Sequence, residues 1–216
     1  MSELLIKAAL SYLLGSIVGG LLIGRLAGGV DIRSVGSGNA GATNALRTLG
    51  RRIAFFVFLI DVAKGWIATG LLAAATLPGV APGPPEWRAW AVPVCGLAVM
   101  LGHVYPLWYG FRGGKGMATL VGAVLGVSPW LLLPMILTWL VTVMICGFVG
   151  LASILASCAL AVRLVVTGAD VPLKAFGIAA ALLVLFTHRS NIARMRAGTE
   201  SRARRLWLLG RRTGQA

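Results

Sequence analysis

The first segment of this chain with functional groups closely spaced enough to bind a ligand is residues 36–47. Its sequence is Gly-Ser-Gly-Asn-Ala-Gly-Ala-Thr-Asn-Ala-Leu-Arg. Glycine has no Cβ atom, so its backbone N–H group can come close to a bound anion. Four nearby side chains can add hydrogen bonds, namely those of Ser37, Asn39, Thr43 and Asn44. Arg47 adds a planar, permanently charged guanidinium. The pattern predicts a segment that binds a phosphate-sized anion.

The same segment has the glycine spacing of a dinucleotide-binding loop, because Gly36, Gly38 and Gly41 follow the pattern Gly-x-Gly-x-x-Gly. That pattern indicates a dinucleotide site only where a β-strand of a βαβ unit precedes it. Here the segment lies between two long apolar spans, so we reject that interpretation. A flexible loop and an anion-binding loop remain. The close spacing of polar side chains favours the anion-binding loop.

A second glycine-rich turn surrounds Lys115, which lies between Gly113-Gly114 and Gly116 directly before an apolar helix. The turn is one residue short of a nucleotide-binding P-loop, and glycine rather than serine or threonine follows the lysine. Backbone N–H groups at a helix start favour anions, and the lysine adds a point charge. The turn therefore predicts a second anion site, and the alternative is a merely positive turn facing the cytoplasm. His103 lies deeper in the preceding span, where a histidine more often bonds between helices than takes part in catalysis.

A third polar segment follows the last apolar span and contains His188 and Asn191, which are three residues apart. A helix would place both side chains on one face, with Arg189 as a further candidate. The tail that follows is rich in arginine, and each arginine near the surface is expected to bind anionic headgroups with about 1 kcal/mol. These residues are Arg202, Arg204, Arg205, Arg211 and Arg212.

The composition is that of a membrane protein, with 58% hydrophobic residues, 12% charged residues and a mean hydropathy of +0.87. Soluble domains carry about 25% charged residues. The net charge of +14 would suit a nucleic-acid partner, but the basic residues have few aromatic residues between them. Anionic lipid and an anionic substrate are therefore the expected partners, and nucleic acid is not. The three cysteines lie in apolar stretches without a Cys-x-x-Cys pair, so we expect reduced thiols and no metal site.

The apolar residues form spans of the length needed to cross a membrane, which is about 20 residues. Four spans cover approximately residues 4–24, 53–77, 89–109 and 173–187. Residues 117–167 have the length of three more, with breaks expected at Ser128-Pro129 and Gly147. The predicted fold is an all-α, polytopic membrane helix bundle with seven transmembrane helices, and six is the main alternative. We expect one integral-membrane domain, residues 1–216, with a basic tail from about residue 195.

Two charged residues, Asp61 and Lys64, lie three residues apart inside the second span. Charges inside a membrane are costly and are usually paired. An internal ion pair and a substrate-facing role are both consistent with this spacing.

The distribution of lysine and arginine predicts the orientation, because these residues concentrate on the cytoplasmic side. With seven helices, one side receives fifteen of the twenty Lys and Arg residues, and the other receives four. Lys64 is the remaining one, inside a span. The N-terminus is therefore expected outside and the C-terminus in the cytoplasm. All three polar segments then lie on the cytoplasmic face.

The three segments together resemble the bacterial acyl-phosphate:glycerol-3-phosphate acyltransferase family, the PlsY type. The matching residues are Gly-Ser-Gly-Asn-x-Gly-Ala-Thr-Asn at 36–44 with Arg47, Gly-His-x-x-Pro at 102–106 with Gly-Gly-Lys-Gly-x-Ala-Thr at 113–119, and His-Arg-x-Asn-Ile-x-Arg at 188–194. The resemblance extends over essentially the whole chain. It implies an enzyme of the bacterial inner membrane, with its active site facing the cytoplasm and no cofactor or metal at the chemical step. The implied reaction transfers a fatty acyl group from acyl phosphate to the sn-1 hydroxyl of glycerol 3-phosphate.

The resemblance also implies roles for the candidate residues. Acyl phosphate would be held by Ser37, Gly38, Asn39, Thr43 and Asn44. Glycerol 3-phosphate would be oriented by the catalytic candidates Arg47, Lys115, His188 and Asn191. The further substrate-binding candidates are Gly41, Gly113, Gly114 and Gly116. His188 is either a general base or only a substrate binder. A transporter for phosphorylated small molecules and a structural membrane scaffold are the alternative functions, and the sequence does not indicate an oligomeric state.

Overall fold

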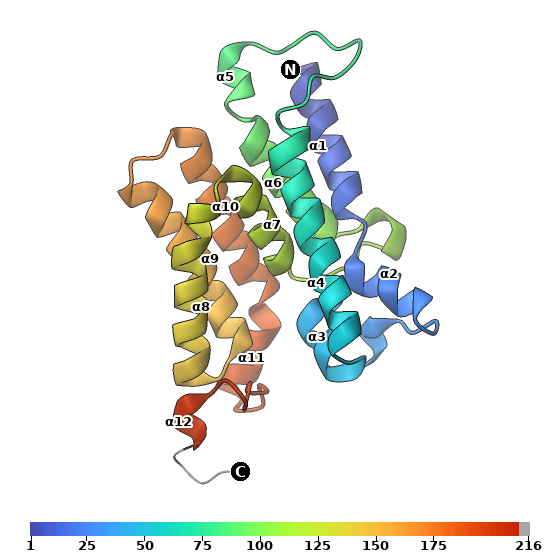
Figure 1. Cartoon of the computed structure of the whole chain (residues 1–216), viewed down its shortest axis with the longest axis vertical. Helices are drawn as coiled ribbons and strands as arrows, with labels where there is room; N and C mark the ends of the chain where they lie inside the picture. Colours follow the sequence, from blue (N-terminus) through green and yellow to red (C-terminus); the bar gives the residue numbers. More distant parts are fainter. Residues whose placement is uncertain (212–216) are drawn as a thin grey trace. The chain divides into compact units, whose positions relative to one another are not determined.

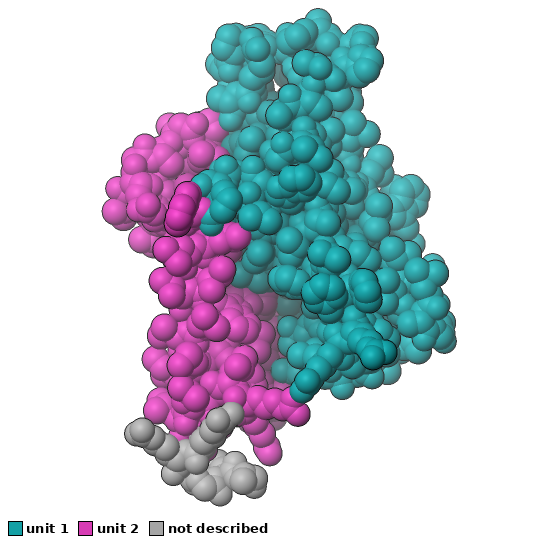
Figure 2. All heavy atoms as spheres, in the orientation of Figure 1, with its two compact units in different colours: residues 1–129 teal, residues 130–216 magenta. Residues whose placement is uncertain are grey.

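The computed structural model of the chain describes residues 1–211, and all the regular secondary structure in that range is helical (Figure 1). It divides into two compact units, of which the first is Met1–Pro129 and the second begins at Trp130 (Figure 2). Arg212 and the four residues after it lie outside the described residues. The predicted all-α class is therefore confirmed for the described part of the chain.

The first unit is a bundle in which α1 packs against α6 and α4 packs against α7. Its elements are α1 (Ser2–Gly15), α2 (Gly19–Leu26), η1 (Ile32–Ser34), α3 (Ala42–Thr48), α4 (Arg51–Trp66), η2 (Ile67–Leu72), α5 (Pro85–Arg88), α6 (Ala91–Val104), η3 (Leu107–Tyr109) and α7 (Met117–Val127). Glycines let α4 and α7 approach closely, because a Cβ atom on Gly65 would collide with the backbone of Thr119 and Ala123. Such close backbone approach is a common device of helix packing in membranes.

The first apolar span is broken between α1 and α2, and buried charges complete the hydrogen bonds that the break leaves open. The Lys64 ammonium on α4 donates to the carbonyl oxygens of Gly15 at 2.9 Å and Ile17 at 2.8 Å. The Asp61 carboxylate accepts from the N–H of Gly19 at 3.2 Å. Asp61 and Lys64 also form an ion pair at 3.0 Å, and they are 0% and 3% exposed. The structure thus shows the internal ion pair of the two alternatives left open by the sequence.

His103 belongs to the same buried cluster. Its Nδ1 atom lies 2.8 Å from Lys64 Nζ and 3.3 Å from Asp61 Oδ1, and the residue is 2% exposed. The cluster therefore connects α4 and α6 and ends directly under the turn that contains Gly114, since the His103 ring would contact a Cβ atom there. The expected role of His103 as a hydrogen bonder between helices is confirmed.

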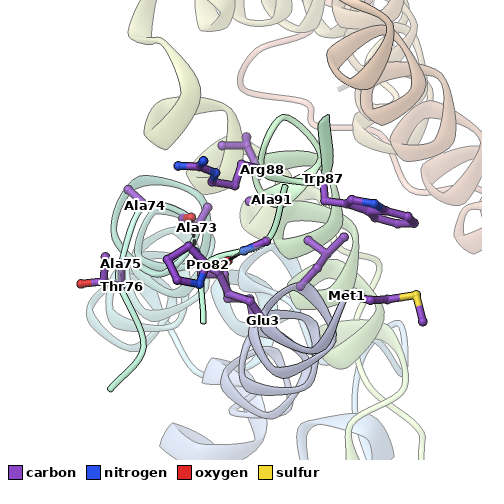
Figure 3. Close-up of a pocket in the computed structure, with 14 residues that line it drawn as sticks. Met1, Glu3, Ala73, Ala74, Ala75, Thr76, Pro82, Trp87, Arg88 and Ala91 are labelled. Atoms are coloured by element: carbon purple, nitrogen blue, oxygen red, sulfur yellow. Dashed lines mark hydrogen bonds and ion pairs between the residues drawn. The ribbon is translucent and has the colours of Figure 1, made fainter. Parts of the chain in front are cut away.

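The opposite end of α1 borders a pocket of about 370 Å³ formed by the ends of α1, η2, α5 and α6 (Figure 3). One wall carries the Glu3–Lys7 ion pair, at 2.8 Å. Lys7 also donates to the carbonyl oxygen of Ala73, and Glu3 accepts from the N–H of Gly83, both at 2.8 Å. The charges on this wall are satisfied by the protein itself, far along α1 from the glycine-rich segments.

The second unit consists of α8 (Leu132–Cys146), α9 (Val149–Val166), α10 (Val171–Thr187), α11 (Arg189–Arg196) and α12 (Leu208–Arg211), after the short η4 (Pro129–Leu131). Helix α9 packs against both α8 and α10. Helix α8 ends at Gly147, which has a φ of +76° that favours glycine. Asp170 caps α10 by accepting from the N–H of Leu173 at 3.0 Å.

Five helical segments within residues 1–211 are long and apolar enough to cross a membrane, and α10 with α11 makes a sixth if that pair, bent by 51°, is counted as one span. The predicted breaks at Ser128-Pro129 and Gly147 are confirmed. The predicted helix between residue 117 and the first break, α7, has only 11 residues. It is about 16 Å long, against a hydrocarbon core of about 30 Å. A seventh crossing therefore stays a prediction.

Candidate active site

The loop before α3 is fixed from inside by the side chain of Asn44, which is 1% exposed. Its Oδ1 atom accepts from the N–H of Ser37 at 2.9 Å, and its Nδ2 atom donates to the carbonyl oxygens of Ile32 and Val35, each at 3.0 Å. Gly36 has a φ of +61°, and a Cβ atom there would collide with the Asn44 carboxamide. Asn44 thus holds the shape of this loop, a task that the sequence analysis did not anticipate.

The surface of this loop and of α3 presents the other predicted phosphate-binding groups. The residues exposed to solvent are Ser37, Gly38, Thr43 and Arg47, while Asn39 and Gly41 are half-buried. Thr43 and Arg47 are one helical turn apart and therefore share a face of α3. Among residues 1–211, the side chain of Arg47 makes no hydrogen bond or ion pair. Its guanidinium is available to an anionic ligand.

The second glycine-rich turn closes the end of α6. The N–H groups of Gly113 and Gly114 donate to the carbonyl oxygens of Val104 and His103, at 3.0 and 3.1 Å. These two groups therefore hold the turn, although the sequence analysis assigned them to the substrate. Gly116 has a φ of +83° and caps α7, and Lys115 beside it is half-buried. The donors of this turn that can serve an anion are then Lys115 and the first N–H groups of α7.

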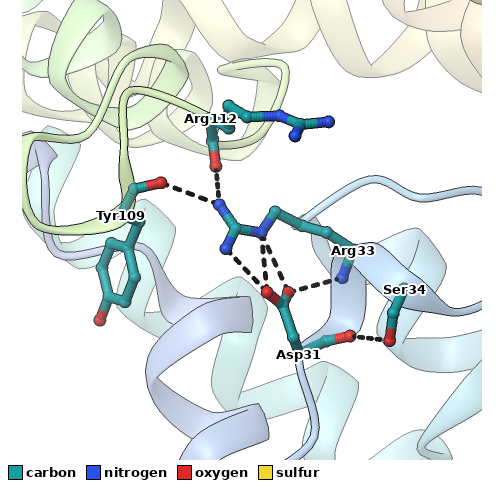
Figure 4. Close-up of polar contacts among 5 residues, drawn as sticks. All are labelled: Asp31, Arg33, Ser34, Tyr109 and Arg112. Atoms are coloured by element: carbon teal, nitrogen blue, oxygen red, sulfur yellow. Dashed lines mark hydrogen bonds and ion pairs between the residues drawn. The ribbon is translucent and has the colours of Figure 1, made fainter.

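Arg33 connects the two segments within the first unit (Figure 4). Its Nε and Nη2 atoms donate to the Asp31 carboxylate, with the shortest distance 2.7 Å. Its Nη1 atom donates to the carbonyl oxygens of Tyr109 at 2.9 Å and Arg112 at 2.7 Å. The hydrogen bonds between the two side chains lower the pKa of Asp31 and raise the pKa of Arg33. This ion pair was not predicted from the sequence. The sequence feature that could have indicated it is the spacing Asp-x-Arg at the start of the loop.

In the second unit, His188 lies at the bend between α10 and α11 and is 4% exposed. Its Nδ1 atom lies 2.8 Å from the carbonyl oxygen of Val184. Because a carbonyl oxygen can only accept, Nδ1 carries the hydrogen in this contact. In the neutral ring, Nε2 is then the nitrogen with a lone pair, as a general base requires.

Asn191, one turn further on, is oriented by an acidic residue of the tail. Its Nδ2 atom donates to Glu200 Oε1 at 2.7 Å, and Arg194 donates to Glu200 Oε2 at 2.6 Å. Gly150 of α9 leaves the space for this amide, because a Cβ atom there would lie 2.8 Å from Asn191 Nδ2. The sequence analysis also missed Glu200, whose signal was a single acidic residue within a basic tail.

A family model described as glycerol-3-phosphate acyltransferase matches residues 5–198. The chain belongs to the glycerol-3-phosphate acyltransferase family. A glycerol-3-phosphate acyltransferase of Aquifex aeolicus is 42% identical over 192 residues, which cover 89% of this chain and 95% of that protein. One of Agrobacterium fabrum is 41% identical over 201 residues, covering 92% and 91%.

Two crystal structures of the acyltransferase PlsY, an integral membrane protein, are also similar to this chain. The glycerol 3-phosphate form has a TM-score of 0.81 and 39% sequence identity, and covers 92% of this chain and 94% of that one. The lysophosphatidic acid form has a TM-score of 0.79 and 38% identity, with the same coverage. The resemblance seen in the sequence motifs is thereby confirmed for the family. The family model ends at residue 198, so it does not include Glu200, the residue that orients Asn191.

The candidate residues of this acyltransferase lie in both units. The first unit joins the segment of Arg47 to the turn of Lys115 through Arg33, and the second holds His188 and Asn191 at the start of α11. Within the described range, no group of three or more His, Cys, Asp and Glu side chains is arranged to hold a metal ion. The candidate residues offer hydrogen-bond donors, positive charge and an imidazole.

Proposed function

We propose that this protein transfers a fatty acyl group from acyl phosphate to the sn-1 hydroxyl of glycerol 3-phosphate, giving lysophosphatidate and phosphate. The observation that supports this most is the joining of two cationic, glycine-rich segments in one unit by Arg33. Two substrates that each carry a phosphate group need two anion sites near each other. Membership of the glycerol-3-phosphate acyltransferase family supports the same reaction.

In this reaction the sn-1 hydroxyl oxygen attacks the carbonyl carbon of the acyl phosphate. A new ester C–O bond forms, the bond from that carbon to the phosphate oxygen breaks, and the electron pair leaves with phosphate. The hydroxyl proton passes to a base, either His188 or a phosphate oxygen of the donor. Because phosphate is a good leaving group, positioning and charge stabilisation supply most of the rate.

The donor phosphate is assigned to the loop that Asn44 holds and to the exposed groups on it. They are Ser37, Gly38, Asn39, Gly41 and Thr43. Glycerol 3-phosphate is assigned to Arg47, Lys115, His188 and Asn191, with Gly113, Gly114 and Gly116 shaping the turn. The two phosphates account for the excess of positive groups over carboxylates on these segments.

Replacement of Asn44 by aspartate is expected to raise the KM for acyl phosphate about tenfold. The aspartate keeps the acceptor for Ser37 but places a carboxylate oxygen against the carbonyl oxygens of Ile32 and Val35, so the loop loses its shape. The cost of each buried group left without a partner is about 1–3 kcal/mol, and the thermal midpoint falls accordingly. Steady-state kinetics measure the effect, with Ser34→Ala as the control for an exposed bond in the same loop. An unchanged KM would contradict the role given to Asn44.

Replacement of His188 by alanine decides between the two bases. If Nε2 of His188 accepts the hydroxyl proton, kcat is expected to fall about 100-fold. In that case the pH profile of kcat should also differ between the variant and the wild type. A variant with normal kcat and a raised KM for glycerol 3-phosphate would instead make His188 a binder. Arg196→Gln removes an exposed charge from the same helix and serves as the matched control.

We further propose one integral domain over residues 1–216 in the bacterial inner membrane, with seven crossings, α7 as the short one, and the site facing the cytoplasm. The N-terminus is then outside, and the basic tail from about residue 195 is inside. The lysine and arginine bias supports this arrangement. In the second unit the tail contacts the turn between α8 and α9, as Ala203 donates to the carbonyl oxygen of Gly147 at 2.8 Å. Cysteine labelling from each side of the membrane tests the orientation.

The direct test is purified protein mixed with palmitoyl phosphate and glycerol 3-phosphate, with lysophosphatidate and released phosphate measured together. We expect equal amounts of both products after subtraction of the phosphate that is released without glycerol 3-phosphate. Palmitoyl-CoA in place of palmitoyl phosphate is the matched control and should give none. Uptake of labelled glycerol 3-phosphate into proteoliposomes without an acyl donor, and no lysophosphatidate with one, would support a transporter instead.

A further inference from the structure

Asp31 and Arg33 form a clamp, a name used here for their two side chains together with the carbonyl oxygens of Tyr109 and Arg112. The clamp spans a large distance in sequence, since Arg33 lies 76 residues before Tyr109 and 79 before Arg112. The Asp31 side chain is 48% exposed, and an ion pair so open to water adds little to stability. Its geometry is nevertheless specific, because one planar guanidinium contacts a carboxylate and two carbonyl oxygens (Figure 4).

Each side of the clamp is continuous with one of the two anion-binding segments. Arg33 is three residues before Gly36, where the loop held by Asn44 begins. Arg112 is three residues before Lys115. Both segments therefore follow the clamp directly along the chain, and a shift at Arg33 changes the distance between them.

The chemistry of Arg33 makes it a poor phosphate ligand itself. Its Nε, Nη1 and Nη2 atoms all donate to protein oxygens, and the Asp31 carboxylate neutralises its charge. The side chain of Arg47, in contrast, makes no hydrogen bond or ion pair within the described part of the chain. The two arginines of this loop region thus differ in availability, and only Arg47 is placed to take an anion.

We propose that Asp31 and Arg33 are positioning residues. They fix the distance between the loop that Asn44 holds and the turn of Lys115, so that the two substrates meet in a reactive arrangement. This inference rests on the proposed function. Acyl transfer requires reacting atoms about 3–3.5 Å apart, and a displacement of about 1 Å can lower the rate about 100-fold. Water has no such requirement, because it can reach an acyl phosphate from many directions.

The test therefore compares two fates of the same acyl phosphate, transfer to glycerol 3-phosphate and hydrolysis by water. Lysophosphatidate and free palmitate are measured in one reaction for Arg33→Gln, Arg33→Lys and the wild type. After the hydrolysis measured without enzyme is subtracted, the ratio of transfer to enzyme-dependent hydrolysis does not depend on how much protein is folded. We expect the ratio to fall about tenfold or more in Arg33→Gln. It should fall by less in Arg33→Lys, because the lysine ammonium keeps the charge but lacks the planar set of N–H donors of the guanidinium.

Arg112→Gln is the matched control, because Arg112 enters the clamp through its carbonyl oxygen and its side chain points away from the carboxylate (Figure 4). Its ratio should equal that of the wild type. If Arg33→Gln keeps the wild-type ratio while both rates fall together, the clamp is only structural and the proposal is wrong. If the wild type itself makes no lysophosphatidate, the proposed function fails, whatever Arg33 does.

A second measurement is independent of turnover. Nitroxide labels on the variants Ser34→Cys and Arg112→Cys, combined in protein without its native cysteines, report the distance between the two segments. The distance distribution should broaden in Arg33→Gln and stay narrow with the native arginine. An unchanged distribution would overturn the proposal even where hydrolysis is too slow to measure.

Discussion

Alanine in place of Lys115 is expected to lower kcat/KM for glycerol 3-phosphate about 1,000-fold while the protein remains folded. Lys115 is the one cation of a turn whose neighbouring N–H groups, those of Gly113 and Gly114, are used to close α6. Its ammonium therefore supplies most of the positive charge that this turn can give to a phosphate. Removing one such preorganised donor costs about 100–1,000-fold in rate.

Two variants separate charge from geometry at this position. Lys115→Arg keeps the charge in another shape and should retain part of the activity, whereas Arg112→Gln removes a charge from the same loop and should retain nearly all of it. Turnover is measured with palmitoyl phosphate in detergent, and folding by size-exclusion chromatography. A Lys115→Ala enzyme with near-normal kcat/KM would remove this turn from the proposed site.

The second large effect concerns stability. Methionine in place of Lys64 is expected to destabilise the fold by about 3–5 kcal/mol, because it leaves Asp61 as a buried charge without its cation. The carbonyl oxygens of Gly15 and Ile17 lose their donor in the same step. A lower thermal midpoint and a lower yield of monodisperse protein in detergent would show this.

The double variant Asp61→Asn with Lys64→Met is the control, because it removes both charges and keeps an acceptor for the N–H of Gly19. It should be more stable than Lys64→Met alone, since no unpaired charge remains. A single Lys64→Met variant as stable as the wild type would contradict the role assigned to this cluster.

Sequence patterns predicted the ends of helices where a proline or a glycine determines the local backbone conformation. Ser128 before proline and Gly147 mark helix ends, and both breaks are where they were predicted. The bounds of α7 follow from the same kind of signal, because Gly116 precedes its first residue and Ser128-Pro129 follows its last. Whether a helix of this length crosses the membrane does not follow from composition.

The sequence indicated which residues belong to the candidate site more reliably than it indicated which partner each of them binds. The motifs around Arg47 and Lys115 indicated anion binding, and those assignments stay predictions. Asn44 was assigned to the ligand, but its amide bonds the backbone of its own loop. An amide side chain has the same donors for either use, so only the fold shows which one it takes. Two partners of Arg33 are the backbone oxygens of Tyr109 and Arg112, which leave no side-chain signature in a sequence.

The interrupted first span has a consequence for how the chain is inserted during synthesis. On its own, a helix interrupted after Gly15 would carry bare carbonyl groups into hydrocarbon, at several kcal/mol each. The ammonium that satisfies them arrives only with the next hydrophobic stretch, on α4. The first two stretches are therefore expected to leave the translocation machinery as a paired hairpin, not one after the other.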